Sequence, residues 1–174
     1  SNNFFNLTID ASEYKTVQTN LSIDGNLGNN NVSLDMTNGS TGNFDLTLGT
    51  DFTMSNGTFT AGTSDAHTVG GSWTENGGTF TPTAGTFTFN GAGNITQFLG
   101  NNFFNLTVEA GTRTAGSDLK IDGALLVDQA TSILDMDETG DFTLDVGGDL
   151  TISNEGTLRP QGSINHNIAG NGDD

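Results

Sequence analysis

The chain has 174 residues, of which only 32% are hydrophobic, and it contains 25 glycines and no cysteine. Its 21 acidic residues against four basic ones give a net charge of −17. This balance argues against nucleic acid and anionic membrane surfaces as partners, because both attract Lys and Arg. No apolar run is long enough for a transmembrane span, so we expect no membrane insertion. Without cysteine there is no disulfide and no thiolate zinc site.

A motif at the start of the chain returns about 99 residues later. Residues 2–10 read Asn-Asn-Phe-Phe-Asn-Leu-Thr-Ile-Asp, and residues 101–109 are identical at seven of these nine positions. Four further matches follow in the same order: 21–25 with 119–123, 34–36 with 134–136, 51–56 with 149–154, and 67–71 with 166–170. A fixed internal period is typical of repeat architectures. We therefore expect one continuous solenoid over residues 1–174, with copy one at 1–99 and an incomplete copy two at 100–174.

Short segments in which apolar residues alternate with Thr, Ser or Asp run along both copies. This period of two predicts half-buried strands. The clearest runs are 46–48, 52–54, 59–61, 80–81, 87–89, 142–144 and 150–152. Asn-Gly and Gly-Gly pairs lie between them, at 38–39, 56–57, 76–78, 90–91 and 147–148, and favour turns. No segment has helical periodicity, so an all-β fold is predicted.

Two all-β architectures fit this pattern. The very short strands and the threonine runs favour a right-handed parallel β-solenoid (β-helix), in which each coil stacks on the one before. The spacing of similar motifs predicts coils of roughly 20–30 residues and hence about seven coils. Asn-Gly is also the usual two-residue hairpin turn, so an antiparallel β-sandwich is the alternative.

Three phrases resemble the repeats of very large bacterial cell-surface proteins. They are Thr-Phe-Thr-Phe-Asn-Gly at 86–91, Phe-Phe-Asn-Leu-Thr-Val at 103–108 and Leu-Lys-Ile-Asp-Gly at 119–123. The resemblance covers nearly the whole chain. It implies a parallel β-helix on an adhesin, a surface layer or a fibre, in an extracellular or cell-surface location, and it implies no catalytic residues.

An acidic turn in copy two is the candidate metal site. Residues 135–141 read Asp-Met-Asp-Glu-Thr-Gly-Asp, and calcium takes six to eight oxygen ligands. Asp135, Asp137 and Asp141 are therefore the predicted calcium ligands, although the stretch has neither EF-hand spacing nor the glycine-rich nonapeptide. A solvated acidic edge without metal is the alternative.

Two histidines, His67 and His166, hold equivalent positions in the two copies. Lone histidines this far apart do not form a ligand pair, and we expect them at corners or on the surface. The four basic residues are scattered, and a catalytic site needs only one copy, so we expect no enzyme.

The expected function is structural, as a stiff segment of a surface adhesin or a subunit of an extracellular filament. The chain opens directly on repeat sequence, which suggests a processed product or an excised fragment. Its ends are expected to meet neighbouring solenoid modules or identical subunits. Ice binding is one alternative, from Thr-x-Thr at 58–60, 79–81 and 86–88. Glycan binding is another, with Trp73 and Tyr14 as the amphipathic aromatic residues.

Overall fold

The computed structural model describes residues 2–10, 14–37, 44–63, 66–136, 142–160 and 167–168. In this part of the chain there are 23 strands and no helix, hence no helix long and apolar enough to cross a membrane. All the strand pairs formed there are parallel. The predicted parallel β-solenoid is therefore confirmed, and the antiparallel sandwich is excluded.

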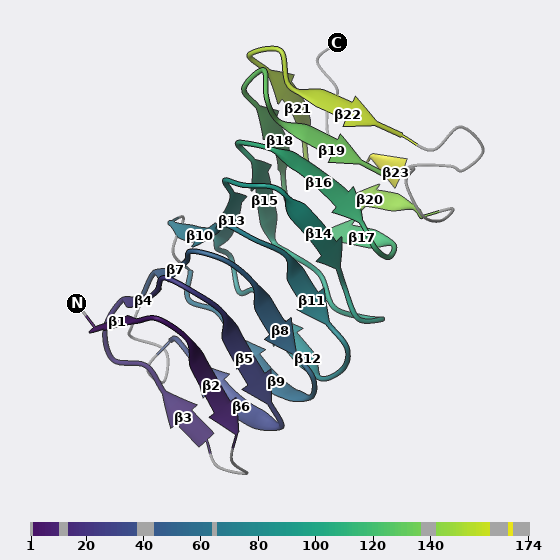
Figure 1. The fold of residues 1–174 in the computed structure, drawn as a ribbon. Coiled ribbons are helices and arrows are strands. Elements are labelled where there is room, and N and C mark those ends of the chain that lie inside the picture. Colours follow the sequence, from purple (N-terminus) through teal and green to yellow (C-terminus); the bar gives the residue numbers. More distant parts are fainter. Residues whose placement is uncertain are drawn as a thin grey trace.

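The coils have three faces, and every coil except the one that contains β13 and β14 places one strand on each of them (Figure 1). The first face is one sheet of β1 (Asn2–Phe4), β4 (Leu21–Ile23), β7 (Leu46–Leu48), β10 (His67–Val69), β13 (Thr86–Phe89), β15 (Asn105–Val108), β18 (Leu125–Asp128) and β21 (Leu150–Ser153). The second face is one sheet of β2 (Leu7–Asp10), β5 (Leu27–Asn30), β8 (Phe52–Met54), β11 (Trp73–Glu75), β14 (Gly93–Thr96), β16 (Thr112–Ala115), β19 (Ile133–Asp135) and β22 (Thr157–Arg159).

The third face is divided into two sheets. The first is built from β3 (Tyr14–Thr16), β6 (Val32–Asp35), β9 (Gly57–Thr60) and β12 (Thr79–Thr81). The second is built from β17 (Leu119–Ile121), β20 (Leu144–Val146) and β23 (Asn167–Ile168). Residues 97–104 lie between them and contribute only a bridge from Phe103 to Ile121. The third face is therefore broken after the fourth coil.

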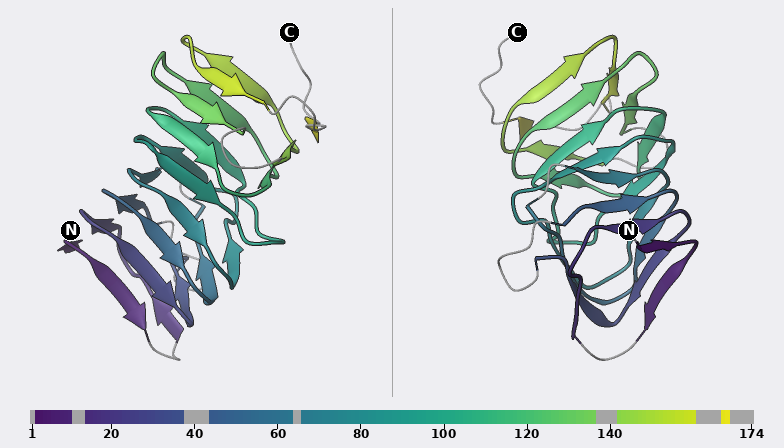
Figure 2. Two further views of the ribbon diagram at one scale, coloured as in Figure 1. Left: turned by 45° about the vertical axis from the view of Figure 1, so that its right-hand side comes forward. Right: turned by 90° about the vertical axis from the view of Figure 1, so that its left-hand side faces the viewer.

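Eight strands on each of the first two faces delimit about seven coils, as predicted. Along the first face Asn2 pairs with Leu21, 19 residues on, and Leu21 pairs with Leu46, 25 residues on. These coil lengths lie in or just below the lower part of the predicted range of roughly 20–30 residues. Figure 2 shows an elongated stack with β1 and β2 at one end and β21 and β22 at the opposite end.

The sequence repeat does not contain a whole number of coils. From β4, four further strands of the first face follow (β7, β10, β13, β15), and the counterpart of β4, which is β17, comes two faces later. One repeat therefore advances the stack by four coils and two thirds. As a result, each counterpart lies one face away: β8 on the second face corresponds to β21 on the first, and β6 on the third corresponds to β19 on the second.

One corner contact is kept in both copies despite this rotation. The Asn6 Oδ1 atom accepts the backbone N–H of Asn26 at 2.8 Å, and the Asn105 Oδ1 atom accepts that of Ala124 at 2.8 Å. A Cβ at Gly123 would lie 2.3 Å from Asn105 Oδ1 and 2.8 Å from the Phe104 carbonyl oxygen. Glycine is thus required where the next coil passes over the asparagine, which explains why the two repeat phrases occur together.

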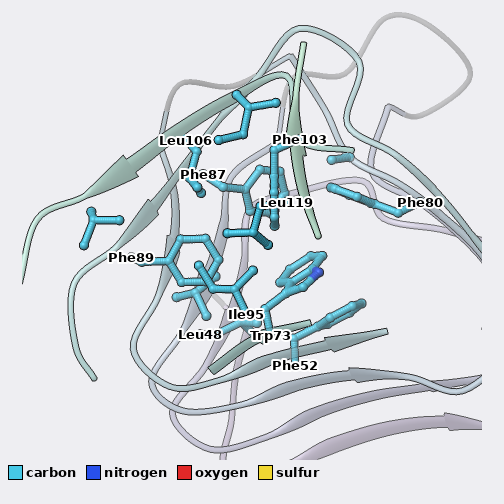
Figure 3. Close-up of a cluster of buried hydrophobic side chains, with 14 of the residues drawn as sticks. Leu48, Phe52, Trp73, Phe80, Phe87, Phe89, Ile95, Phe103, Leu106 and Leu119 are labelled. Carbon is cyan, nitrogen blue, oxygen red and sulfur yellow. The ribbon is translucent and has the colours of Figure 1, made fainter. Parts of the chain in front are cut away.

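The core is a continuous column of inward-facing side chains, and its middle is aromatic (Figure 3). Phe52 stacks on Trp73 with ring centroids 3.9 Å apart, and Trp73 is fully buried. Phe103 is surrounded by four rings at 5.4 to 5.8 Å, those of Trp73, Phe80, Phe87 and Phe89. Burying such side chains contributes about 1.5–3 kcal/mol each, so these coils have the densest apolar packing.

Candidate functional site

Of the three predicted calcium ligands, the structure places only Asp135. Its side chain is almost buried, and its Oδ2 atom accepts a hydrogen bond from Arg159 Nη1 at 3.1 Å across neighbouring strands. Asp137 and Asp141 lie outside the described residues. Among the residues that are described, no group of three or more metal-binding side chains comes together. The calcium site stays a prediction, and Asp135 has an ion-pair partner without metal.

His67 is fully buried at the start of β10, so the expectation of a corner or surface position was wrong for this residue. Its Nδ1 atom accepts the backbone N–H of Leu46 at 3.1 Å, and Nε2 lies 3.1 Å from the carbonyl oxygen of Gly62. That carbonyl requires a proton on Nε2, which fixes the neutral tautomer. The ring stacks on Phe87 with centroids 4.6 Å apart. His67 is a structural side chain, and His166 lies outside the described residues.

Two amide side chains close the strand edges at the break in the third face. The Asn101 Oδ1 atom accepts the N–H of Phe80 in β12 at 3.1 Å. The Gln97 side chain accepts the N–H of Lys120 in β17 at 2.7 Å and donates to its carbonyl at 3.1 Å. Asn101 thereby satisfies an N–H group at the edge of β12, and Gln97 acts together with the Phe103 bridge at the edge of β17.

Glu75 lies at the centre of this break and is 2% exposed. Its carboxylate accepts hydrogen bonds from Trp73 Nε1 at 2.7 Å, Asn101 Nδ2 at 2.7 Å and the Phe98 N–H at 3.0 Å. Burial raises the pKa of the Glu75 carboxyl above its usual value, and these hydrogen bonds only partly oppose that effect. The geometry is that of a structural acid that orders the loop after β14.

A cavity of about 360 Å³ lies beside this loop, lined by Phe98, Leu99, Asp118, Lys120 and Asp145 among others. Leu99 is 93% exposed and Phe98 is 42% exposed. Asp118 Oδ1 accepts the N–H of Thr143, and Lys120 pairs with Asp122 at 3.2 Å. The charged groups are therefore engaged with the protein itself.

A larger cavity of about 490 Å³ opens at the end of the stack formed by β1, β2 and β3. We call this end the N-terminal face and define it by Phe4, Leu7, Ile9, Lys15 and Val17, which all line the cavity. Phe4 is 39% exposed, and the other three apolar residues are only partly buried. No described strand pairs with the outer edges of β1, β2 and β3.

Arg113 is an unexpected buried cation in β16. Its guanidinium donates to the carbonyl oxygens of Val69, Gly70 and Gly71, at the corner two coils below, and lies 4.8 Å from the centre of the Phe89 ring. Burial lowers its pKa to about 10, against an opposing effect of Asp51. Arg113 therefore stays charged at neutral pH and fastens the first coils of copy two onto copy one.

Threonines form a regular row along the outside of the first face. Thr47, Thr68, Thr88 and Thr107 pair in register from coil to coil. On the third face, Thr-x-Thr pairs stand in register only on β9 and β12. Of the two aromatic residues considered for glycan stacking, Trp73 is fully buried and Tyr14 is exposed with its hydroxyl bonded to Asp35.

No family model, curated protein or solved structure matches this chain. Glu75, Gln97 and Asn101, which organise the break, were not predicted from the sequence, because isolated Glu, Gln and Asn residues have no periodic pattern. One signal was available for Asn101, since it belongs to the repeated Asn-Asn-Phe-Phe-Asn phrase.

Proposed function

We propose that the chain is a stiff structural segment of an extracellular or cell-surface protein, such as the stalk of an adhesin. The proposal rests on a core that continues through all coils and on polar side chains in the middle of most strands on the outside. The net charge of −17 keeps such an extended surface soluble and resists lateral association. The resemblance to bacterial surface repeats supports the location.

The features that the two repeat copies share favour a structural role over ligand binding. The two copies share the corner contacts of Asn6 and Asn105, but the rotation turns any shared surface feature to a different face. The acidic turn of copy two is also absent from the corresponding part of copy one. What the copies have in common thus serves stacking, whereas a repeated ligand site would need a repeated surface.

Antibodies raised against the chain provide the test, applied to intact cells of the source organism and to permeabilised cells as the control. Labelling of intact cells is expected, at a distance from the envelope that grows with the number of repeat copies in the full-length protein. Labelling confined to permeabilised cells would refute the extracellular role. Electron microscopy of the purified chain over a concentration series separates a segment from a filament subunit, since only the latter forms fibres.

Ice binding is the second candidate, and the row of Thr47, Thr68, Thr88 and Thr107 favours it. The parallel-strand spacing of about 4.8 Å separates neighbouring hydroxyls. An assay of ice recrystallisation with the purified chain decides it. Inhibition that disappears on Thr68→Lys and Thr88→Lys would support ice binding, and unaffected crystal growth would exclude it.

A further inference from the structure

The strands that begin each repeat copy are buried in copy two but lie at the end of the stack in copy one. Phe103, Leu106 and Val108 in copy two are 0%, 1% and 0% exposed. Their counterparts Phe4, Leu7 and Ile9 form the N-terminal face, where Phe4 is 39% exposed. The sequences are nearly identical, so the difference in burial comes from what lies beneath each set.

The end of copy one covers the start of copy two. Phe87 and Phe89 of β13 pair in register with Leu106 and Val108 of β15. Phe103 inserts among the four rings of Trp73, Phe80, Phe87 and Phe89, which Figure 3 shows on neighbouring coils. The segment that accepts this set of side chains is therefore residues 67–100, which carries all four rings.

The basic residue of the N-terminal face fits the same arrangement. Lys15 pairs with Leu34, and Arg113 pairs with Leu134, which is the counterpart of Leu34. Lys15 is thus the counterpart of Arg113, whose guanidinium binds the carbonyls of 69–71 in the segment that covers copy two. The N-terminal face and the buried start of copy two thus have a cationic side chain, Lys15 and Arg113 respectively, at the same position.

We propose that the N-terminal face binds the last coils of a preceding copy of this repeat. The sequence of those coils resembles residues 67–100, and each of their strands lies one face away from its counterpart in this chain. The strand corresponding to β12 then lies under β1, that corresponding to β13 under β2, and that corresponding to β14 under β3. Phe4 inserts among four aromatic rings as Phe103 does. This partner rests on the proposed role as a segment of a longer array.

The opposite end of this chain is a poorer partner for the N-terminal face. Its last coil presents β21 and β22, in which Leu150 and Leu158 are only partly buried, Ile152 is exposed, and no residue is aromatic. By sequence, β21 corresponds to β8, and β8 is followed on its face by β11, which contains Trp73. The repeat therefore predicts that a strand resembling β11 follows β21. Stacking a second chain directly on this one would place β1 or β2 there instead, at the wrong point of the repeat.

The test joins residues 67–100 directly to Asn2 of the otherwise complete chain, which reproduces the natural Gly100-Asn-Asn-Phe-Phe junction. The extended chain is expected to unfold at a higher Tm than the chain without the extension. Phe4→Ala should lower Tm by roughly 6–20 °C in the extended chain and by roughly 4 °C or less without it. Thr8→Ala, on the outward side of β2, is the matched control and should have the same small effect in both.

A second control carries Phe87→Ser and Phe89→Ser within the added segment only, and this extension should not raise Tm. An unchanged Tm for the intact extension, an effect of Phe4→Ala that does not grow, or an equal gain from the doubly substituted extension would each overturn the proposal. Light scattering on the chain without the extension should show monomers, and dimers abolished by Phe4→Ala would show that the face binds this chain's own other end. Cell-surface labelling is unaffected by these outcomes, so the proposed function can fail or hold separately.

Discussion

At the scale of single residues, the corners of the solenoid leave no room for a side chain where one coil crosses the next. A Cβ at Gly123 would meet Asn105 Oδ1 at 2.3 Å and a backbone oxygen at 2.8 Å, whereas one at Gly28 would meet only Thr8 side-chain atoms at 3.7 Å. Gly123→Ala should therefore cost about 1–3 kcal/mol, and Gly28→Ala should change stability by less than about 0.5 kcal/mol. Urea denaturation of both variants measures the difference, and equal effects would contradict the role of the corner contact.

Glu75 links stability to pH in a direction set by its burial. Its folded-state pKa is raised, so the stability it contributes is fully present below the unfolded pKa and is lost as the pH rises through the folded value. Glu75→Gln resembles the protonated side chain in shape and in having both donor and acceptor atoms, but it cannot ionise. The wild type should therefore lose stability relative to the variant as the pH rises from about 4.5 toward neutrality. Denaturation curves at several pH values check this, and a wild type that gains stability relative to the variant as the pH rises would show that the carboxylate is stabilised instead.

The acidic turn of copy two gives a prediction for calcium. If Asp135, Asp137 and Asp141 bind the ion, calcium at one hundred times its Kd should stabilise the chain by about 2.7 kcal/mol. Asp137→Asn with Asp141→Asn should abolish that gain without lowering the melting temperature in the absence of calcium. Asp135→Asn should destabilise with or without the ion, because it also breaks the pair with Arg159. A melting temperature that does not respond to calcium would leave a solvated acidic edge.

At the scale of elements, the alternation of apolar and polar residues predicted the strands well. It gave no information about the side chains that satisfy the strand edges at the break in the third face. Runs such as 52–54 and 87–89 are strands with their Phe side chains buried, as the period of two requires. The break in the third face was not foreseen, because its edges are closed by single amide side chains. Alternation of apolar and polar residues identifies a strand. The hydrogen bonds of a single Gln or Asn side chain depend instead on which backbone groups the next coil places beside it.

Gln97 provides the element-scale test of that closure. Gln97→Ala would leave the N–H of Lys120 without its acceptor at the lower edge of β17. The expected cost is about 1–3 kcal/mol, together with faster hydrogen exchange of the Lys120 amide. Gln18→Ala, at an exposed position, is the control and should change neither. Unaltered exchange at Lys120 would mean that neighbouring residues satisfy the edge without Gln97.

At the scale of the whole molecule, the sequence revealed the repeat but not which face of the solenoid each repeated strand occupies. Matches such as 21–25 with 119–123 count residues along the chain, and they carry no information about how many faces the chain has passed. The coils are also unequal, with 19 residues between Asn2 and Leu21 and 25 between Leu21 and Leu46, so a residue count does not give the number of faces passed. Only the strand pairing shows that the copies are turned relative to each other.

The distribution of core side chains predicts a gradient of local stability along the stack. Apart from contacts such as that of Arg113, which reaches two coils down, stacked coils mainly contact their neighbours, so each coil's stability depends on its own core and the coils on either side. Coils from β8 to β15 contain the packed aromatic rings, whereas Leu7 and Ile9 at one end and Leu150 and Leu158 at the other are only partly buried. Hydrogen exchange measured by mass spectrometry should therefore be slowest between β8 and β15 and fastest in β1–β3 and β21–β22. Extending the chain with residues 67–100 should slow exchange in β1–β3 alone, and uniform protection from end to end would show that the stack unfolds as one cooperative unit.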